Sequence, residues 1–275
     1  MSKLASFSLA LYAIATGNTI HAATITDFNT WSLVEDPPNA NLSASIDSSN
    51  QVTLNANGSV PNAADIGFQS VDGNTPASSS SGFAFDPSNS FSLAIDYDWT
   101  FQNAVGGSAI GFGIGEDGAG AQSAGVSLVA SGPTILVAGV AARTSQSETN
   151  IPLISPGSPS PTGSMHMSYD AITGDIVAGI GATGAGSPLL AGTLTGASIY
   201  ELLNSDADSD LLLVSFFIRS QDLGLVGPPL SSGTSTAVFS NFRVVSGNPV
   251  AIPEPTLLGL SVLAGIGFIA RRGRI

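Results

Sequence analysis

The chain has 275 residues, of which seven are lysine or arginine, twenty are aspartate or glutamate and none is cysteine. This composition excludes disulfides and thiolate metal sites, and it leaves too few cations to neutralise the phosphates of a nucleic acid. Because only three arginines but nineteen carboxylates lie between the two ends of the chain, that part has a formal charge of −16, and we expect no nucleic-acid partner.

The first 23 residues have the features of a secretory signal peptide. Lys3 supplies a positive start, residues 4–15 are mainly apolar, and residues 18–23 are polar with small residues at their end. This order is typical of a cleaved export signal. We predict a signal helix over residues 1–23 and cleavage near Ala22 or Ala23. A buried N-terminal helix is the alternative.

Residues 24–246 are rich in small residues and valine, and their apolar residues recur with period two. In residues 91–101 this alternation places an aromatic-rich set on one face of a strand. Further short apolar runs cover residues 108–114, 125–130, 134–140, 211–219 and 235–245. Many short strands separated by turns predict an all-β sandwich or barrel, and the almost continuous run over 211–219 is expected in the middle of a sandwich.

Residues 151–163 contain four prolines and are expected to form a loop. The loop could separate two domains. Neither half of the body has a complete set of strands, however, so we expect one β-sandwich over residues 24–246, followed by a short tether over residues 247–252.

Residues 165–177 predict a β-hairpin, because Asp170 can bond its own backbone and Gly174 can adopt a positive φ. The Tyr169-Asp-x-x-Thr-Gly174 turn between two strands resembles a hairpin of concanavalin A-like lectins and laminin-G-like jelly rolls. The segment Phe239-Ser-Asn-Phe-Arg-Val-Val245 is similar to the last strand of exported β-sandwich modules. These resemblances imply a jelly-roll sandwich of the concanavalin A-like type.

Two aromatic residues of the first long strand, Tyr97 and Trp99, are candidates for stacking on a sugar, as a lectin-type fold would imply. The alternative is that both belong to the core. Asp96 and Asp98 point to the opposite face of the same strand, because they are two residues apart. They could form a pair of carboxylates on the solvent side.

The sequence offers little for catalysis. His166, the only histidine after the signal peptide, lies in a predicted strand and is expected to face solvent or a partner. No glutamate begins the Glu-x-Asp-x-x-Glu strand that concanavalin A-like glucanases carry, and glycoside hydrolysis needs two carboxylates. We predict a protein that is not an enzyme, and we keep a glycan hydrolase as a less favoured alternative.

Asp206, Asp208 and Asp210 are spaced like the first ligands of a calcium loop. The pattern then departs from such a loop, because Leu211 stands where glycine belongs and Phe217 where glutamate belongs. Calcium is therefore the one cofactor that the sequence suggests, and an acidic, solvated turn before the 211–219 strand is the alternative.

The C-terminus carries the most specific pattern. Pro253, Glu254 and Pro255 precede an uncharged apolar run of 15 residues over 256–270, and a basic tail over 271–275 contains Arg271, Arg272 and Arg274. As a helix the run would span roughly 22 Å, somewhat less than the ~30 Å hydrocarbon core of a bilayer. The arginines would stay on the cytoplasmic side. The pattern predicts a single transmembrane helix with a stop-transfer cluster, and a buried core helix is the alternative.

The order over residues 253–275 resembles the PEP-CTERM sorting signal. The resemblance implies export across the inner membrane of a Gram-negative, often biofilm-forming bacterium and a transient inner-membrane anchor. It also implies cleavage near the Pro-Glu-Pro motif by an exosortase, a membrane-embedded cysteine transpeptidase. The protein would then reach the cell surface or the extracellular matrix, where exopolysaccharide is a potential partner. We expect a non-catalytic envelope or matrix protein. The alternative is a lectin-like carbohydrate-binding module, with or without calcium.

Overall fold

The computed structural model describes residues 27–71, 82–115, 123–143, 148–153, 159–195, 211–224 and 227–251. The predicted signal peptide over residues 1–23 and the predicted membrane segment over residues 253–275 lie outside these ranges. Within them, the structure has no helix with the length and apolar character needed to span a bilayer.

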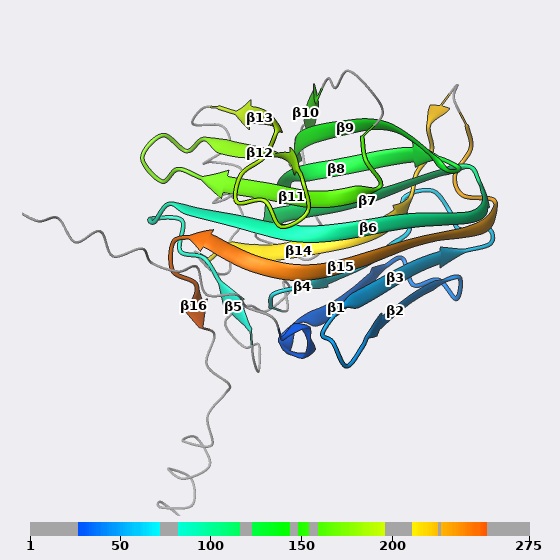
Figure 1. Ribbon diagram of the computed structural model, residues 1–275, viewed down its shortest axis with the longest axis horizontal. Helices are drawn as coiled ribbons and strands as arrows, with labels where there is room; N and C mark the ends of the chain where they lie inside the picture. Colours follow the sequence, from blue (N-terminus) through cyan, green and yellow to red (C-terminus); the bar gives the residue numbers. More distant parts are fainter. Residues whose placement is uncertain are drawn as a thin grey trace, which may run out of the picture.

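The described residues form two antiparallel sheets that pack face to face (Figure 1). The first, which we call the groove sheet, has seven strands in the order β1-β4-β14-β7-β8-β9-β10. Their bounds are Ser32–Asp36 (β1), Asp65–Gln69 (β4), Leu213–Ser220 (β14), Gly107–Gly115 (β7), Ser123–Ser131 (β8), Thr134–Arg143 (β9) and Glu148–Leu153 (β10).

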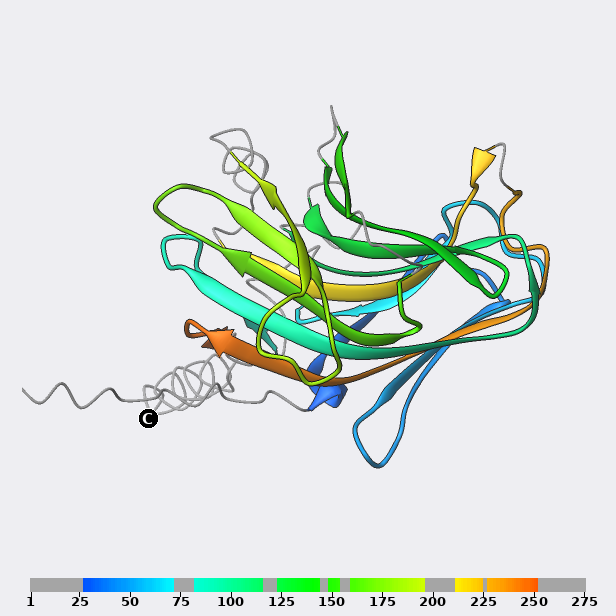
Figure 2. The ribbon, with the colours of Figure 1, turned by 45° about the horizontal axis from the view of Figure 1, so that its top comes forward.

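The second sheet, which we call the covered sheet, also has seven strands, in the order β13-β12-β11-β6-β15-β3-β2. Their bounds are Leu190–Leu194 (β13), Ile176–Gly181 (β12), Thr162–Tyr169 (β11), Phe91–Val105 (β6), Ser232–Ser246 (β15), Val52–Asn57 (β3) and Leu42–Ile46 (β2). The long strands β6 and β15 run side by side along the body in both views (Figures 1 and 2).

Two short elements complete the described part of the chain. A 3₁₀ turn, η1 (Phe28–Thr30), is capped at its N-terminus by Asp27, whose carboxylate accepts from the Asn29 amide. A two-stranded sheet pairs β16 (Val250–Ala251) with β5 (Phe83–Ala84). The segment predicted to be a tether over residues 247–252 is therefore partly a strand that pairs with the body.

Aromatic side chains fill the space between the two sheets because the strands alternate inward and outward residues. Phe216 is fully buried at the centre, and its ring centroid lies between 4.7 and 5.9 Å from those of four other aromatic residues. These neighbours are Phe28, Trp31, Phe68 and Phe239. Such stacked, tilted and edge-on contacts stabilise the fold beyond the burial of the rings.

The predicted all-β sandwich is confirmed, and so are the main predicted strands. Residues 91–101 lie within β6, the run over 211–219 lies largely within β14, and the end of the body is β15. β14 lies between β4 and β7, in the interior of its sheet, as its continuous apolar run indicated. The hairpin over residues 165–177 also forms: the Gly174 amide donates to the Asp170 carbonyl at 2.8 Å, and Gly174 has a φ of 73°.

The expectation that residues 151–163 are entirely loop is wrong at both ends. Ile151 and Pro152 belong to β10, where they pair with β9, and Thr162 begins β11. Pro152 is tolerated because β10 is the edge strand of its sheet, so no neighbouring strand needs its missing N–H. Strands from before and after this segment take part in both sheets.

Phe216→Ala should lower the free energy of unfolding by about 3–5 kcal/mol, because it leaves a cavity among four aromatic rings. Urea denaturation of the body measures this loss. Thr100→Ala, at an exposed position of β6, should stay within about 0.5 kcal/mol of the wild type. Equal losses from the two variants would contradict the central place of Phe216 in the core.

Candidate functional site

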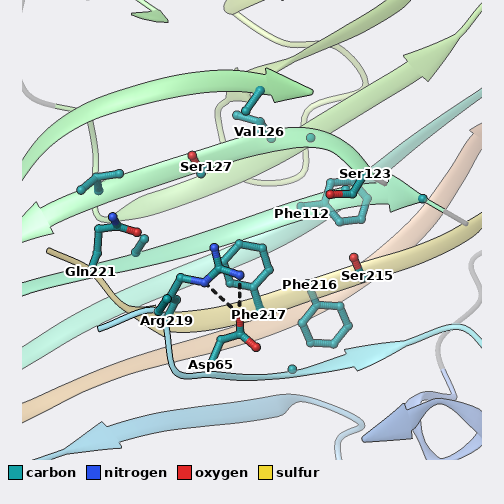
Figure 3. A pocket seen from close by; sticks show the side chains of 18 of the residues that line it. Asp65, Phe112, Ser123, Val126, Ser127, Ser215, Phe216, Phe217, Arg219 and Gln221 are labelled. Atoms are coloured by element: carbon teal, nitrogen blue, oxygen red, sulfur yellow. Dashed lines mark hydrogen bonds and ion pairs between the residues drawn. The ribbon is translucent and has the colours of Figure 1, made fainter. Parts of the chain in front are cut away.

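A groove with a volume of about 580 Å³ lies on the outer face of the groove sheet (Figure 3). Its lining includes at least one residue from each of the seven strands, from Val34 on β1 to Asn150 on β10. The groove therefore runs across the strands. Neighbouring strands are about 4.8 Å apart, so the path from β1 to β10 covers roughly 29 Å. A chain-like ligand could lie along it.

Small outward-facing residues leave the space for this groove. The lining includes Gly67, Gly113, Gly115 and Gly125, and a Cβ atom added at Gly67, Gly113 or Gly125 would lie 2.1–2.8 Å from a backbone oxygen of a neighbouring strand. The inward residues that alternate with them, such as Phe112 and Ile114, are buried in the core. The same strands are thus bulky on the core side and nearly bare on the groove side.

Phe217 is the outward-facing aromatic residue of this lining, and a glycine lies opposite it on each neighbouring strand. It pairs with Gly67 on β4 and with Gly111 on β7. A Cβ atom added at Gly111 would lie 2.5 Å from the Phe217 ring, and one added at Gly67 would lie 2.1 Å from the Phe216 carbonyl oxygen. The ring therefore lies over Gly111 because this residue has no side chain, and Gly67 lets the backbone of β4 approach that of β14 closely.

Arg219 covers the Phe217 ring and is held by Asp65 (Figure 3). Its guanidinium carbon lies 5.0 Å from the ring centroid, within the range of a cation–π contact. Its Nε and Nη2 atoms donate to Asp65 Oδ2 at 2.8 and 2.5 Å. Asp65 and Arg219 are also directly opposite each other on β4 and β14. These contacts fix the guanidinium plane and leave its remaining N–H groups available to a ligand.

The rest of the lining is mostly uncharged. Hydroxyl and amide groups come from Asn62, Gln69, Ser123, Ser127, Asn150, Ser215 and Gln221. Because the charges of Asp65 and Arg219 offset each other, the described lining carries little net charge. Hydrogen-bonding groups around one apolar ring suit a ligand that is polar, uncharged and partly apolar on its faces.

Among the described residues that line the groove, Asp65 is the one carboxylate, and it is paired with Arg219. A glycosidase of the usual type needs two carboxyl groups, one of them a proton donor. The described part of the chain also has no cluster of three or more potential metal ligands among histidine, cysteine, aspartate and glutamate.

The structure corrects the expectation that Tyr97 and Trp99 could stack on a sugar. Both rings point into the core, with exposures of 3% and 1%. The Tyr97 hydroxyl donates to the Ser160 carbonyl at 3.1 Å, and burial raises the pKa of Tyr97 to about 12. Trp99 Nε1 donates to Ser235 Oγ at 2.9 Å. Alternation in β6 sends both rings inward, so neither can stack on a ligand from solvent.

Asp96 and Asp98 do not form a solvent-side pair. Asp98 is exposed, but Asp96 is buried on the outer face of the covered sheet and accepts from Arg243 Nη1 at 2.9 Å. Asp96 also accepts from Ser164 Oγ, from Asn241 Nδ2 at 2.8 Å and from the Gly184 amide at 3.1 Å. Burial alone would raise the pKa of Asp96, but these hydrogen bonds outweigh it and hold the pKa below 3.8.

Residues 182–189, which connect β12 to β13, are held over this cluster. Arg243 Nη2 donates to the Ala185 carbonyl at 2.5 Å, and Ser164 Oγ donates to the Ala182 carbonyl at 2.9 Å. Because its polar groups bond to one another and to the connecting residues, the cluster serves structure.

His166 lies beside this cluster and is buried, which corrects the expectation that it faces solvent. Its exposure is 4%, and its Nε2 atom has no hydrogen-bond partner among the described residues. Burial lowers the pKa of His166 to about 4, and the positive charge of Arg243 acts in the same direction, while Asp96 acts in the opposite one. The side chain is therefore neutral near pH 7.

The other predicted site residues lie outside the described ranges. They are the candidate calcium ligands Asp206, Asp208 and Asp210, the sorting motif Pro253, Glu254 and Pro255, and the stop-transfer residues Arg271, Arg272 and Arg274. Their roles stay predictions.

Sequence reasoning missed the residues that form the groove. The sequence pattern assigns Phe217 and Arg219 to an apolar strand, and it names Phe217 otherwise only as a departure from a calcium loop. Two signals could have drawn attention to them: an arginine inside a run that is otherwise mainly apolar, and glycines at every second position of residues 107–115, with the exception of Ala109. That spacing removes side chains from one face of a strand.

No family model and no curated protein matches the chain. Several solved structures match the chain at low sequence identity. One is the catalytic domain of an endo-1,3-β-glucanase (laminarinase) from Thermotoga petrophila RKU-1. It is 9% identical, the match covers 80% of this chain and 92% of that chain, and the TM-score is 0.49.

Two lectin structures match in a similar way. Peanut lectin is 12% identical, with 78% of this chain and 92% of that chain covered and a TM-score of 0.41. The legume lectin-like domain from Entamoeba histolytica is 11% identical, with 78% and 88% covered and a TM-score of 0.43. At such identities and TM-scores these matches assign no ligand or reaction to this chain.

His166→Gln should make the stability of the body less sensitive to acid. As pH falls from 6.5 towards about 4, the unfolded wild type binds a proton at His166 while the folded protein does not, so stability is lost. The loss is at most roughly 3 kcal/mol at 1.36 kcal/mol per pH unit. The contribution of Asp96 persists above 3.8 and is lost only as pH falls through its lowered pKa.

Urea denaturation at pH 7 and at about pH 4.5 measures this difference for the wild type and the variant. The other titratable groups are the same in both proteins, so the difference between the two losses isolates His166. Equal losses on acidification would show that His166 does not titrate in this way.

Proposed function

We propose that this protein is an exported, non-catalytic glycan-binding protein of the cell envelope or extracellular matrix, with a body of the concanavalin A-like type. The observation that carries the proposal is the groove across the strands of one sheet, with the Phe217 and Arg219 pair above a floor of glycines. The proposed export and sorting rest on the sequences at the two ends of the chain.

Sugars in a glycan chain have apolar C–H faces and polar hydroxyl edges. The groove offers groups for both. The planar stack of Phe217 and Arg219 can take a sugar face, and the half-buried hydroxyls of Ser127 and Ser215 in the lining can bond to sugar hydroxyls. The length of the groove favours several consecutive sugar units over a single one.

The charge of the protein favours a neutral glycan. The part between the two terminal signals has a formal charge of −16, which repels polyanions at low ionic strength. Within the groove, an acidic sugar would need the positive charge of Arg219, but Arg219 already forms an ion pair with Asp65. An uncharged exopolysaccharide meets neither obstacle.

Binding without cleavage is supported by the pairing of Asp65. A carboxylate that accepts two hydrogen bonds from one guanidinium is poorly placed to donate a proton, and the described lining offers no second carboxylate to act with it. A glycan hydrolase is therefore the less favoured alternative.

Delivery is proposed from the sequence. An export signal over residues 1–23 and the Pro253-Glu254-Pro255 motif, apolar run and arginine cluster over residues 253–275 would carry the body across the inner membrane. An exosortase-type transpeptidase would then act near the motif.

Phe217→Ala should weaken binding of a neutral soluble glucan by at least about tenfold, which corresponds to 1.4 kcal/mol, because the platform for a sugar face is removed. Affinity electrophoresis in gels that contain the glucan measures this change, after a glycan array has identified the best sugar. Thr100→Ala, on the outer face of the other sheet, is the matched control and should bind like the wild type.

Two results would overturn glycan binding in the groove: an array on which the wild type binds nothing, or unchanged retention of Phe217→Ala. A chelator arm tests calcium separately. Loss of wild-type binding on chelation would assign a calcium requirement.

Mass spectrometry of the mature protein from the native host should find a C-terminus close to Glu254, without Arg271, Arg272 and Arg274. The physical reason is that the short apolar run and its arginines serve as a transient membrane stop. An intact C-terminal tail in the bulk of the protein would contradict sorting by cleavage.

A further inference from the structure

The outward-facing residues of the groove sheet lie in rows that cross the strands. In one of these rows, which we call the trench row, each residue is directly opposite the next one on the neighbouring strand, from β4 to β10. Its members, which all line the groove, are Gln69, Ser215, Gly113, Gly125, Ala141 and Asn150. The four at its centre, on β14, β7, β8 and β9, carry no side chain longer than that of serine. The trench row is therefore low over four consecutive strands.

A second row runs beside the trench row and is raised where Phe217 lies. Phe217 is two residues from Ser215 on β14, so the two rows are about 6.8 Å apart. The Phe217 ring lies over Gly111 of β7, and the guanidinium carbon of Arg219 is 5.0 Å from the ring centroid. Figure 3 shows Ser215, Phe217 and Arg219 one after another along β14. A ligand in the trench row would thus have the Phe217 and Arg219 pair at its side.

Two serine hydroxyls lie within reach of such a ligand. Ser215 belongs to the trench row and Ser127, opposite Gly111 on β8, belongs to the row beside it. Both side chains are half-buried and line the groove. A serine hydroxyl can donate and accept a hydrogen bond, as a sugar hydroxyl can. These two hydroxyls on different strands favour a ligand with hydroxyl groups along its length.

The spacing of the strands sets which chain can follow the trench row. The ligand meets a new strand about every 4.8 Å. A sugar whose equatorial bonds leave from opposite ends of its ring, as in a β-1,4-linked glucan, extends its chain by about the length of the ring. That length is close to the strand spacing, so successive sugars can take equivalent positions on successive strands.

Chains with other linkages do not match this spacing. The axial bond of an α-1,4-linked glucan makes the chain coil, and so do the bonds of a β-1,3-linked glucan, which do not leave from opposite ends of the ring. A coiled chain advances by less than one ring per sugar. It is also wider than one row, and beside the trench row it meets the Phe217 and Arg219 pair.

We propose that the groove selects a linear, uncharged glycan in an extended form, with β-1,4-type linkages and about one sugar on each strand from β4 to β10. The inference rests on the proposed glycan binding and names the class of glycan. The linkage is selected by the spacing of the backbone, and the Phe217 and Arg219 pair contacts the chain near β14 and β7.

Calorimetric titration of the full chain with unbranched oligosaccharides tests this selection. Three series of two to about six glucose units are compared, with β-1,4, β-1,3 and α-1,4 linkages. The affinity for the β-1,4 series should rise by at least about tenfold from two to six units, because each added sugar reaches another strand. At six units, both other series should bind at least about tenfold more weakly.

Ala141→Leu tests whether the chain reaches β9. Ala141 is half-buried and lies three strands from β14, roughly 14 Å away. The larger side chain extends into the trench row, so the affinity for six β-1,4-linked units should fall by at least about tenfold. The affinity for three units should fall much less, because a short chain can bind beside Phe217 without reaching β9.

Val137→Leu is the matched control. Val137 is an exposed residue of the same strand and lies outside the described lining of the groove. This variant should bind six units like the wild type, and urea denaturation checks that both variants are folded.

Equal or tighter binding of either coiled series overturns the inference. An affinity that stops rising at two units also overturns it, as does an unchanged affinity of Ala141→Leu for six units. A wild type that binds no glycan of any linkage overturns the proposed function itself, and that result is distinct from these three.

Discussion

The register of β14 between β4 and β7 is the constraint on which both the core and the groove depend. Two consecutive phenylalanines, Phe216 and Phe217, point to opposite faces of this strand, one into the aromatic core and one into the groove. A shift of one residue would exchange them and would bury Arg219 in the core. Two features oppose such a shift. Phe217 pairs with a glycine on each side, and Arg219 lies directly opposite Asp65, its ion-pair partner.

Each sheet has an ion pair between an arginine and an aspartate on its outer face, but only one of the two pairs faces an open groove. Arg219 pairs with Asp65 on the outer face of one sheet, and Arg243 pairs with Asp96 on the outer face of the other. Over Arg243 the connection at residues 182–189 closes the face and takes up the remaining hydrogen bonds. Over Arg219 the groove stays open, so its unused donors can meet a ligand. Glycine in a strand costs conformational entropy, and on the groove sheet this cost yields an open surface.

Much of the fold could be predicted from the sequence because period-two alternation reports directly which face of a strand is buried. It placed β6, β14 and β15, and it indicated that β14 lies in the interior of its sheet.

The errors have physical causes. Tyr97 and Trp99 were candidates for a sugar platform as aromatic residues, but alternation alone already sends them inward. His166 and Asp96 do point outward from their strands, yet residues 182–189 cover them, and no local pattern reveals a connection that folds over a distant face. A proline such as Pro152 predicts a loop unless its strand is known to lie at the edge of a sheet. The arrangement of Phe217 and Arg219 depends on Gly67 and Asp65 of β4 and on Gly111 of β7. These residues lie far from β14 in the sequence, so the local pattern does not reveal them.

The strand that carries the groove is linked to the pairing of β16 with β5 through the residue directly before it. Leu212, directly before β14, binds β5, and β5 binds β16. Phe217 lies five residues after Leu212, which corresponds to about 17 Å along a strand. The last described residues of the body are thus fixed near one end of the strand that carries the groove.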